Sequence, residues 1–504
     1  MDMSKPDKEL PMPSISSALG MAAAYYSYPW LASLSPSSYL ILGLLFLVAV
    51  IIAFFRTLRH LPGGTNSTMH KVAILATALA VGFSLGLAAR RAVSGPAEFG
   101  IPAENVMAVG GVLREDPRAL YGGSGLGVLE LALCSGAEGL RASARGNLTV
   151  FFPADSIPYL REFGRGSEIY ADGRLSEGSL GLLFNARSVH IVSPASPLET
   201  FRTGLRINLL ERFQSRQGRV TPVWGALASA LLLGVRDDLN VELAEGFRNA
   251  GCSYVLALSG MHLAIISGVL AFLIRRPLGI RWASLVGALF IVFYVFVAGS
   301  QPSLVRSAIM YLIGTVAVWG FLKRNVLSVL CMAFIIQLLF QSNTGTSLSF
   351  IFSYLALFGI LTIGERLRVL FRGRLPEILN ASLSASIGAF VFTAPVVALY
   401  FDYLRPIGIV AGPIVAALAS LFMVLALAAL LASFLPFPLW DLLDLILTQL
   451  YRLIDFTISL AGQVPGIPVS GTLWTLIFSV LFSLLVLFIH KQDQIYRNRI
   501  AAFN

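Results

Sequence analysis

The residues best suited to chemistry lie in one apolar stretch, GCSYVLALSGMHL at 251–263. Ser259 and His262 are three positions apart in it, so their side chains would share one face of a helix. A serine beside a histidine base is the arrangement of a nucleophilic hydrolase. No acidic residue that would orient the histidine is evident, so we expect no enzymatic activity. His262 is then either a packed histidine bonded to a neighbouring helix or part of a polar path through the membrane.

A second unusual residue is Arg306, about one turn inside the outer end of an apolar segment. Arg248 and Arg405 lie on the same predicted side of the membrane, where the positive-inside trend disfavours arginine. Arg306 either reaches the lipid headgroups, pairs with Asp402 or Glu245, or lines a wet path for an anionic substrate.

The composition indicates what kind of molecule must position these residues. Of the 504 residues, 56% are apolar and 13% are charged, with three cysteines and a net charge of +10. A soluble domain carries about a quarter charged residues. A soluble enzyme, a disordered chain and a disulfide-rich scaffold are therefore excluded, and a polytopic α-helical membrane protein is predicted. The cysteine spacing suits no zinc site, so we expect no metal and no cofactor.

Apolar segments near the ~20 residues that cross a bilayer predict about 10–12 spans. They are 17–35, 38–55, 72–89, 252–274, 280–300, 303–321, 325–342, 347–364, 379–400, 406–433, 438–462 and 472–490. Five basic clusters between or after these segments fall on one side, which we take as the cytoplasm. The polar residues 92–198 then lie outside, and the tail lies inside.

The outside block contains five β-like runs, which suit a small barrel such as an OB-fold, or a small sandwich. They are 106–113, 126–133, 147–153, 167–175 and 182–192. OB-folds often bind single-stranded nucleic acid, but this block has eight arginines, no lysine and eleven acidic residues. The candidate DNA contacts are Arg141, Arg145, Arg161, Arg165 and Arg174, with Phe151, Phe152 and Tyr170 as stacking residues, unless these aromatics form the core.

Two further helices are predicted between this block and the next spans. Residues 199–219 form an amphipathic helix with Phe201 on its apolar face and Arg202 and Arg206 on its basic face. It lies on the outer membrane surface or, less simply, at the rim of a pore. The apolar stretch 222–236 is predicted as an interfacial or re-entrant helix that does not cross.

The stretch FRNAGCSYVLALSGMHL resembles the signature of ComEC-type competence proteins, the inner-membrane channels for DNA uptake. The matching residues are Phe247, Arg248, Ala250, Gly251, Ala257, Ser259, Gly260 and His262. Weaker similarities follow in order at PSLVRSAIM, SFIFSYLALFGIL and TAPVVALYF. Tyr254 stands where the family commonly has a second histidine, and Cys134 stands alone where many members have a bridged pair. The histidine–x–aspartate cluster of the family's metallo-β-lactamase-like domain is missing, so no nuclease activity is expected.

The resemblance implies a channel that imports single-stranded DNA during natural transformation. It implies N-terminal spans over 1–91, an OB-like domain over 92–198, amphipathic and interfacial helices over 199–240, a channel domain over 241–490 and a cytoplasmic tail over 491–504. The implied DNA path contains Arg248, Gly251, Tyr254, Ser259, Gly260, His262, Ser303 and Arg306.

The expected partners follow from the transport chemistry. The sequence has no phosphate-binding loop of the G-x-x-x-x-G-K-[ST] type, so a separate motor or strand-binding protein would act in the cytoplasm. Single-stranded DNA, membrane lipid, a DNA receptor outside and possibly a separate nuclease complete the list. The alternative function is a small-solute or lipid-precursor transporter with an extracytoplasmic sensor domain.

Overall fold

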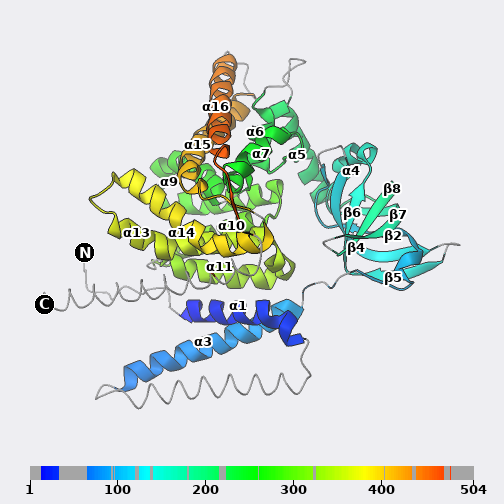
Figure 1. Ribbon diagram of the computed structural model, residues 1–504, viewed down its shortest axis with the longest axis horizontal. Helices are drawn as coiled ribbons and strands as arrows, with labels where there is room; N and C mark the ends of the chain where they lie inside the picture. Colours follow the sequence, from blue (N-terminus) through cyan, green and yellow to red (C-terminus); the bar gives the residue numbers. More distant parts are fainter. Residues whose placement is uncertain are drawn as a thin grey trace.

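The computed structural model describes residues 13–32, 65–91, 93, 95, 97–119, 124–136, 140–178, 181–214, 223–258, 260–321, 325–401, 403–433, 439–469 and 477. The predicted spans at 38–55 and 472–490, the tail at 491–504 and Ser259 lie outside these residues. Within them, the chain forms a bundle of helices with a β domain at one end (Figure 1).

The five predicted β runs all form strands of the β domain. They are β2 (Val106–Leu113), β4 (Gly125–Gly136), β6 (Asn147–Phe152), β7 (Glu168–Gly178) and β8 (Gly181–Ser193); β1 (Glu98–Phe99), β3 (Arg118–Ala119) and β5 (Arg141–Arg145) add shorter pairings. The order is β4-β2-β7-β8-β6, and β6 also pairs with β4, so the sheet closes on itself. Of these five pairings only β6–β8 is parallel. This is the topology of an OB-fold barrel rather than a sandwich.

The barrel interior is filled by alternate residues of its strands. In β6, Leu148, Val150 and Phe152 are buried, and the residues between them are partly exposed. The short helix α4 (Ile157–Phe163) follows β6 and buries Ile157 and Leu160 in the same core. The period of two therefore places one face of each strand inside the barrel.

The helical part is that of a multi-pass membrane protein. Among the described residues, six segments are long and apolar enough to cross a membrane: Gly279–Ala298, Pro302–Trp319, Leu348–Leu370, Glu377–Tyr400, Gly408–Ala432 and Leu442–Gly462. They belong to α9 (Gly260–Ala298), α10 (Pro302–Trp319), α12 (Leu348–Gly359) with α13 (Glu365–Leu370), α14 (Glu377–Tyr400), α15 (Gly408–Ala432) and α16 (Leu439–Gly462). The shorter α11 (Val326–Phe340) packs beside α10 and α12. This architecture confirms the predicted fold class.

Helix α9 is two antiparallel helices joined at Gly279, whose φ of 76° is not helical. Gly260, at one end of α9, lies beside the first turns of α10, and the other end leads into α10 directly. Trp282, just after Gly279, contacts Trp319 at the far end of α10, with ring centres 6.0 Å apart. The chain therefore reverses at Gly279, between the predicted spans 252–274 and 280–300.

Two N-terminal helices, α1 (Pro13–Ala32) and α3 (Thr65–Arg91), lie side by side at the edge of the bundle (Figure 1). The hydroxyl of Tyr25 donates to the carbonyl of Ser342, in the turn that follows α11, at 2.5 Å. Helix α1 is thereby attached to the bundle through α11 and its C-terminal turn.

The helix predicted to lie on the membrane surface is α5 (Pro197–Gln214), and its orientation differs from the prediction. Arg202 is 1% exposed, whereas Phe201 is 62% exposed. The basic face turns inward because acidic side chains of the β domain and of α5 itself bind it. Phe213 and the partly buried Leu205 and Leu209 pack on the helical core.

The stretch predicted as interfacial or re-entrant forms α6 (Gly225–Leu233), which is nine residues long. Residues Leu227 to Leu233 are all buried, and Trp224 donates from Nε1 to Asp444 Oδ1 in α16 at 2.7 Å. A helix of this length cannot cross the bilayer. Its burial among other helices favours the re-entrant form over the interfacial one.

Candidate functional site

The signature segment forms a broken helix. Helix α7 (Val241–Asn249) has Ala250 as its C-cap, and Gly251 then has a φ of 69°. The single turn α8 (Ser253–Leu256) follows before α9 starts. Regular helix therefore begins at Gly260 rather than at the predicted residue 252. Irregular backbone at membrane depth is tolerated where protein buries it or where it lines a cavity, and transporters place their binding sites at such breaks.

Side chains from neighbouring segments bind the carbonyls that the break releases. Arg236 donates to the carbonyl of Leu256 at 2.8 Å. The hydroxyl of Ser303, at the start of α10, donates to the carbonyl of Leu258. Arg405 donates to the last carbonyl of α7 at 3.1 Å. Arg405 and Ser303 therefore hold the break in place.

Arg306 lies near the start of α10 and is only 8% exposed. Its Nη1 donates to the carbonyl of Ser353 in α12, and its guanidinium carbon lies 5.8 Å from the centre of the Tyr354 ring. Nε has no partner among the described residues, and no carboxylate among them pairs with this guanidinium. Burying a cation without an acidic partner is costly.

The sequence left open an ion pair between Arg306 and Glu245, and the structure does not contain this pair. Glu245 pairs instead with Arg248 on the exposed face of α7, at 3.2 Å. Asp402, the other proposed partner, lies outside the described residues. The structure therefore places Arg248 in a surface pair on its own helix and away from Arg306.

A chain of hydrogen bonds fixes the helices around Arg306. The hydroxyl of Tyr354 donates to Gln337 Oε1 at 2.8 Å, and Gln337 Nε2 donates to the carbonyl of Pro302 at 2.9 Å. These bonds join α10, α11 and α12. Gln337, Tyr354 and Ser353 were not predicted from the sequence, although a single glutamine in the apolar run AFIIQLLF was a usable signal.

The N-terminus of α9 lies next to Arg306. A Cβ on Gly260 would lie 2.6 Å from Ser307 Oγ and 3.4 Å from Arg306 Nη2. His262, in the first turn, is buried, and the charge of Arg236 acts on it. The structure thus brings together Gly260, Ser303 and Arg306, three of the eight residues of the predicted path.

Two other predicted path residues lie on the opposite side of the break. Gly251 packs against α15, where a Cβ would lie 2.9 Å from the carbonyl oxygen of Arg405. Tyr254 is exposed, and its hydroxyl lies against Gly412 of α15. The structure therefore places both beside α15 and gives neither a contact with Arg306.

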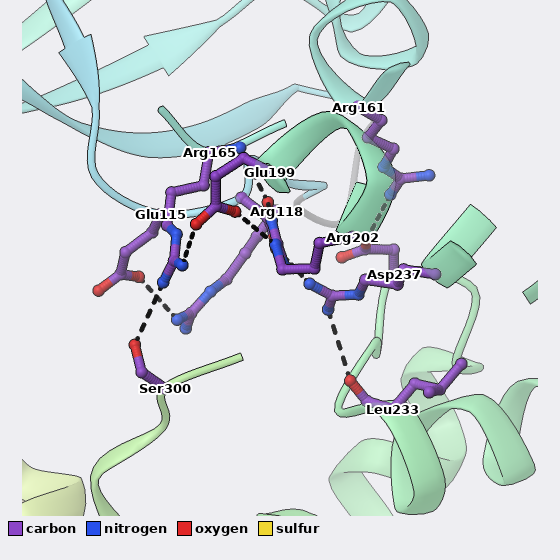
Figure 2. Close-up of polar contacts among 11 residues, drawn as sticks. Glu115, Arg118, Arg161, Arg165, Glu199, Arg202, Leu233, Asp237 and Ser300 are labelled. Atoms are coloured by element: carbon purple, nitrogen blue, oxygen red, sulfur yellow. Dashed lines mark hydrogen bonds and ion pairs between the residues drawn. The ribbon is translucent and has the colours of Figure 1, made fainter. Parts of the chain in front are cut away.

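A cluster of ion pairs joins the barrel to the helical part (Figure 2). Arg202 binds both carboxylate oxygens of Asp116, at 2.9 and 2.5 Å, and Arg206 also pairs with Asp116. Arg202 Nε pairs with Glu199 at 2.6 Å. Asp116 lies between β2 and β3, so the barrel contributes the carboxylate and α5 contributes both arginines.

The electrostatics of Asp116 follow from these contacts. Burial alone would raise its pKa, but the hydrogen bonds from Arg202 and the charges of Arg206 and Arg202 outweigh burial. The pKa of Asp116 is lowered to about 2, so the carboxylate is ionised at neutral pH.

Two of the five predicted DNA contacts belong to this junction. Arg161 pairs with Asp237, which follows α6, and Arg165 pairs with Glu199 (Figure 2). Arg165 Nη1 also contacts Ser300 Oγ, between α9 and α10, at 3.4 Å. Both arginines therefore form ion pairs that attach the barrel. Their contact with DNA stays a prediction.

The other three arginines, Arg141 and Arg145 on β5 and Arg174 on β7, are exposed. Of the predicted stacking residues, Phe152 is a core residue, as the alternative reading proposed. Phe151 is partly exposed on the outer face of β6, and the Tyr170 hydroxyl donates to Ser135 Oγ at 3.2 Å. A metal centre is not indicated, since no group of three or more His, Cys, Asp or Glu ligands occurs in the described part of the chain.

The profile of one protein family, described as Competence protein, matches residues 231–493. That is just over half of the chain, and it contains the broken helix and Arg306. The chain belongs to the Competence protein family. The resemblance to ComEC-type competence proteins is thereby confirmed.

This competence protein is similar to an uncharacterized protein of Aquifex aeolicus (strain VF5), with 27% identity over 232 residues, covering 46% of this chain and 54% of the relative. It is also similar to ComE operon protein 3 of Bacillus subtilis (strain 168), with 30% identity over 136 residues, covering 25% of this chain and 17% of the relative. The chain therefore spans about half or less of the length of these relatives. No solved structure matches it.

Proposed function

We propose that this competence protein is a channel that imports single-stranded DNA across the bacterial inner membrane during DNA uptake. The observation that carries the proposal is Arg306, a buried cation in a membrane-spanning helix with no acidic partner among the described residues. A polyanion crossing the membrane needs positive groups along its path. The role is transport, with no covalent bond made or broken by this chain.

The proposed orientation puts the barrel outside and the tail in the cytoplasm. Helix α13 holds Arg366 and Arg368, and the turn between α13 and α14 holds Arg372 and Arg374. This turn lies at the end of the bundle away from the barrel (Figure 1). Basic residues concentrate on cytoplasmic loops, which supports this orientation.

A further component must drive the strand inward. Each negative charge that moves toward a negative interior costs about 2.3 kcal/mol per 100 mV. One buried arginine cannot offset this cost for a strand with one charge per nucleotide. We propose that a cytoplasmic motor or strand-binding protein pulls the strand, and that a receptor outside delivers it.

The test is uptake of labelled DNA into the cytoplasm of a transformable host. The deletion strain is compared with strains that carry Arg306→Ala, His262→Ala or the control Arg368→Gln. Arg368 is exposed and pairs with Glu377 at 2.5 Å, so its loss removes one positive charge away from the site. We expect at least tenfold lower uptake for Arg306→Ala and normal uptake for the control, at equal protein levels in the membrane.

Normal uptake in the deletion strain would reject the channel and favour the small-solute or lipid-precursor transporter. If the deletion strain loses uptake but Arg306→Ala takes up DNA normally, the channel function is supported. The DNA path would then not pass Arg306.

A further inference from the structure

Two turns at the end of the bundle away from the barrel carry basic and aromatic residues that the proposed DNA path does not include. One turn surrounds Gly279 within α9, and the other follows α10. They lie side by side, since the ring centres of Trp282 and Trp319 are 6.0 Å apart. The opposite end of the same two helices holds Ser300, which contacts Arg165 of the barrel. In the proposed orientation, the two turns therefore lie at the cytoplasmic leaflet of the membrane.

Three aromatic side chains at these turns are exposed. Trp282 and Trp319 are partly covered by each other, whereas Phe321 is 77% exposed. Phe321 has a φ of 53°, and in the described part of the chain it is the one residue other than glycine with a positive φ. This conformation is costly for a bulky residue. The strained turn places the exposed ring of Phe321 4.4 Å from the guanidinium carbon of Arg281.

The charge at these turns is positive. The sequence has five basic residues at or next to them: Arg275, Arg276, Arg281, Lys323 and Arg324. Residues 246–364, which include α9, α10 and α11, contain no aspartate or glutamate. The side chains of Arg275 and Arg281 are exposed. The surface is therefore complementary to an anion.

An exposed apolar face continues from the two tryptophans along both helices. The exposed residues that follow Trp282 or precede Trp319 at helical spacing are Leu289, Val292 and Phe293 on α9 and Leu312 and Val316 on α10. The helices approach closely here, because a Cβ on Gly287 would lie 2.2 Å from the hydroxyl oxygen of Tyr311. A continuous exposed apolar face on a multi-pass protein is a membrane contact.

We infer that these two turns bind the headgroup of one anionic phospholipid through Arg281, Trp282 and Phe321, with its acyl chains along the exposed face of α9 and α10. Arginine matches the oxygens of a phosphodiester, and tryptophan lies at the level of lipid headgroups. Basic sites between helices on the cytoplasmic side bind anionic headgroups. The site is independent of the proposed channel function, and only the choice of leaflet rests on the proposed orientation.

A DNA strand carries the same phosphodiester chemistry as the lipid. The apolar face directly beside the arginines favours the lipid, because acyl chains bury this face and a polyanion does not. The strand is therefore the alternative occupant that the experiment has to exclude.

The test uses the full chain in lipid-free maltoside micelles, with phosphatidylglycerol as the probe and zwitterionic phosphatidylcholine as the comparison. Bound lipid is counted by native mass spectrometry over a series of lipid concentrations. We expect Arg281→Gln to bind phosphatidylglycerol about fivefold more weakly and to bind phosphatidylcholine as wild type does. The control Arg368→Gln removes a cation that pairs with Glu377 on the same predicted side, and it should bind both lipids like wild type.

A second variant separates lipid binding from folding. Phe321→Gly removes the ring and introduces the residue that adopts a positive φ without strain. We expect its thermal midpoint without lipid to equal or exceed that of wild type, while phosphatidylglycerol binds roughly threefold more weakly. A lower midpoint with unchanged affinity for phosphatidylglycerol would assign Phe321 to folding and overturn the site.

Three other results would also overturn the site. The first is equal affinity of wild type and Arg281→Gln for phosphatidylglycerol. The second is an equal loss of both lipids in Arg281→Gln, which would indicate a general loss of lipid contact without headgroup recognition. The third is displacement of phosphatidylglycerol by oligothymidylate in wild type but not in Arg281→Gln, which would assign the surface to the strand. Normal DNA uptake in the deletion strain would reject the channel and leave the lipid site in place, because the lipid is measured without DNA.

Discussion

At the scale of single residues, the broken helix depends on Gly251. Its φ of 69° is a conformation that L residues with side chains rarely adopt, and a Cβ would lie 2.9 Å from the Arg405 carbonyl oxygen. We expect Gly251→Ala to lower the free energy of unfolding by roughly 1–2 kcal/mol, measured by denaturant titration in detergent.

The matched control for Gly251→Ala is Gly204→Ala, in α5. No atom lies within 4 Å of the Cβ position of Gly204, and alanine is favoured over glycine within a helix by about 1 kcal/mol. This control should be neutral or stabilising. Equal effects of the two substitutions would contradict the role assigned to the backbone conformation at Gly251.

The hydrogen bond between Tyr354 and Gln337 should contribute measurably because both side chains are buried. We expect Tyr354→Phe to destabilise the protein by about 1 kcal/mol and to leave the aromatic contact with Arg306 in place. Gln337→Leu should destabilise it more, because it also removes the hydrogen bond to the Pro302 carbonyl. The double variant should lose less free energy of unfolding than the two single variants together. A loss equal to their sum would show that the hydrogen bond between the two side chains contributes nothing.

The sequence grouped Gly260, Ser303 and Arg306 in one predicted path, and the structure brings these three residues together. Their role in transport stays a prediction. Arg248 matched the family signature equally well, yet it pairs with Glu245 on the surface. A linear motif does not show which way each side chain points. Motif residues that face the site therefore cannot be told from those that face the surface before the fold is known.

At the scale of elements, α5 shows how tertiary contacts can reverse an amphipathic pattern. The sequence predicts a solvated basic face, but Arg202 is among the most buried side chains because Asp116 and Glu199 bind it. Asp116 is distant in sequence, so nothing local to α5 indicates the contact. The apolar residue Phe201 is exposed as a consequence.

The Asp116 carboxylate should stabilise the junction in a pH-dependent way. Its pKa is lowered from 3.8 to about 2, so the stabilisation is complete above about pH 4 and is lost as the pH falls toward 2. The shift corresponds to about 2 kcal/mol. We expect Asp116→Asn to lower the free energy of unfolding by at least this amount at neutral pH, and the difference from wild type to shrink below pH 4.

The neighbouring residue supplies the control. Glu115 is exposed and pairs with the exposed Arg118 at 2.8 Å, and exposed pairs contribute about 0–1 kcal/mol. Glu115→Gln should therefore unfold like wild type at every pH. If the difference in free energy of unfolding between wild type and Asp116→Asn did not change with pH, the titration of Asp116 would not contribute to the stability of the junction.

At the scale of the whole molecule, the orientation in the membrane can be tested with introduced cysteines. Leu140→Cys places a thiol on the exposed edge of the barrel, and Arg372→Cys places one in the turn between α13 and α14. The three native cysteines are buried. An impermeant maleimide should label position 140 in intact cells and position 372 only after permeabilisation; the reverse pattern would invert the proposed topology.

The architecture was more predictable than the site. Hydropathy and the period of two predicted the six membrane-spanning helices of the described residues and the five barrel strands within a few residues, since both patterns are local. The closure of the barrel through β4 and β6, the burial of α6 and the junction between barrel and bundle depend on contacts between distant segments. These contacts decide how the domains are joined, and no linear pattern encodes them.

The ion pairs at the junction limit where domains can be exchanged between relatives. Asp116 comes from the barrel, and the two arginines that bind it come from α5. A chimaera joined between the barrel and α5, at the domain boundary that the sequence suggests, would put a foreign loop against Arg202 and leave that buried cation without its carboxylate. The transferable unit is therefore the barrel together with α5, and grafts should be joined after Gln214.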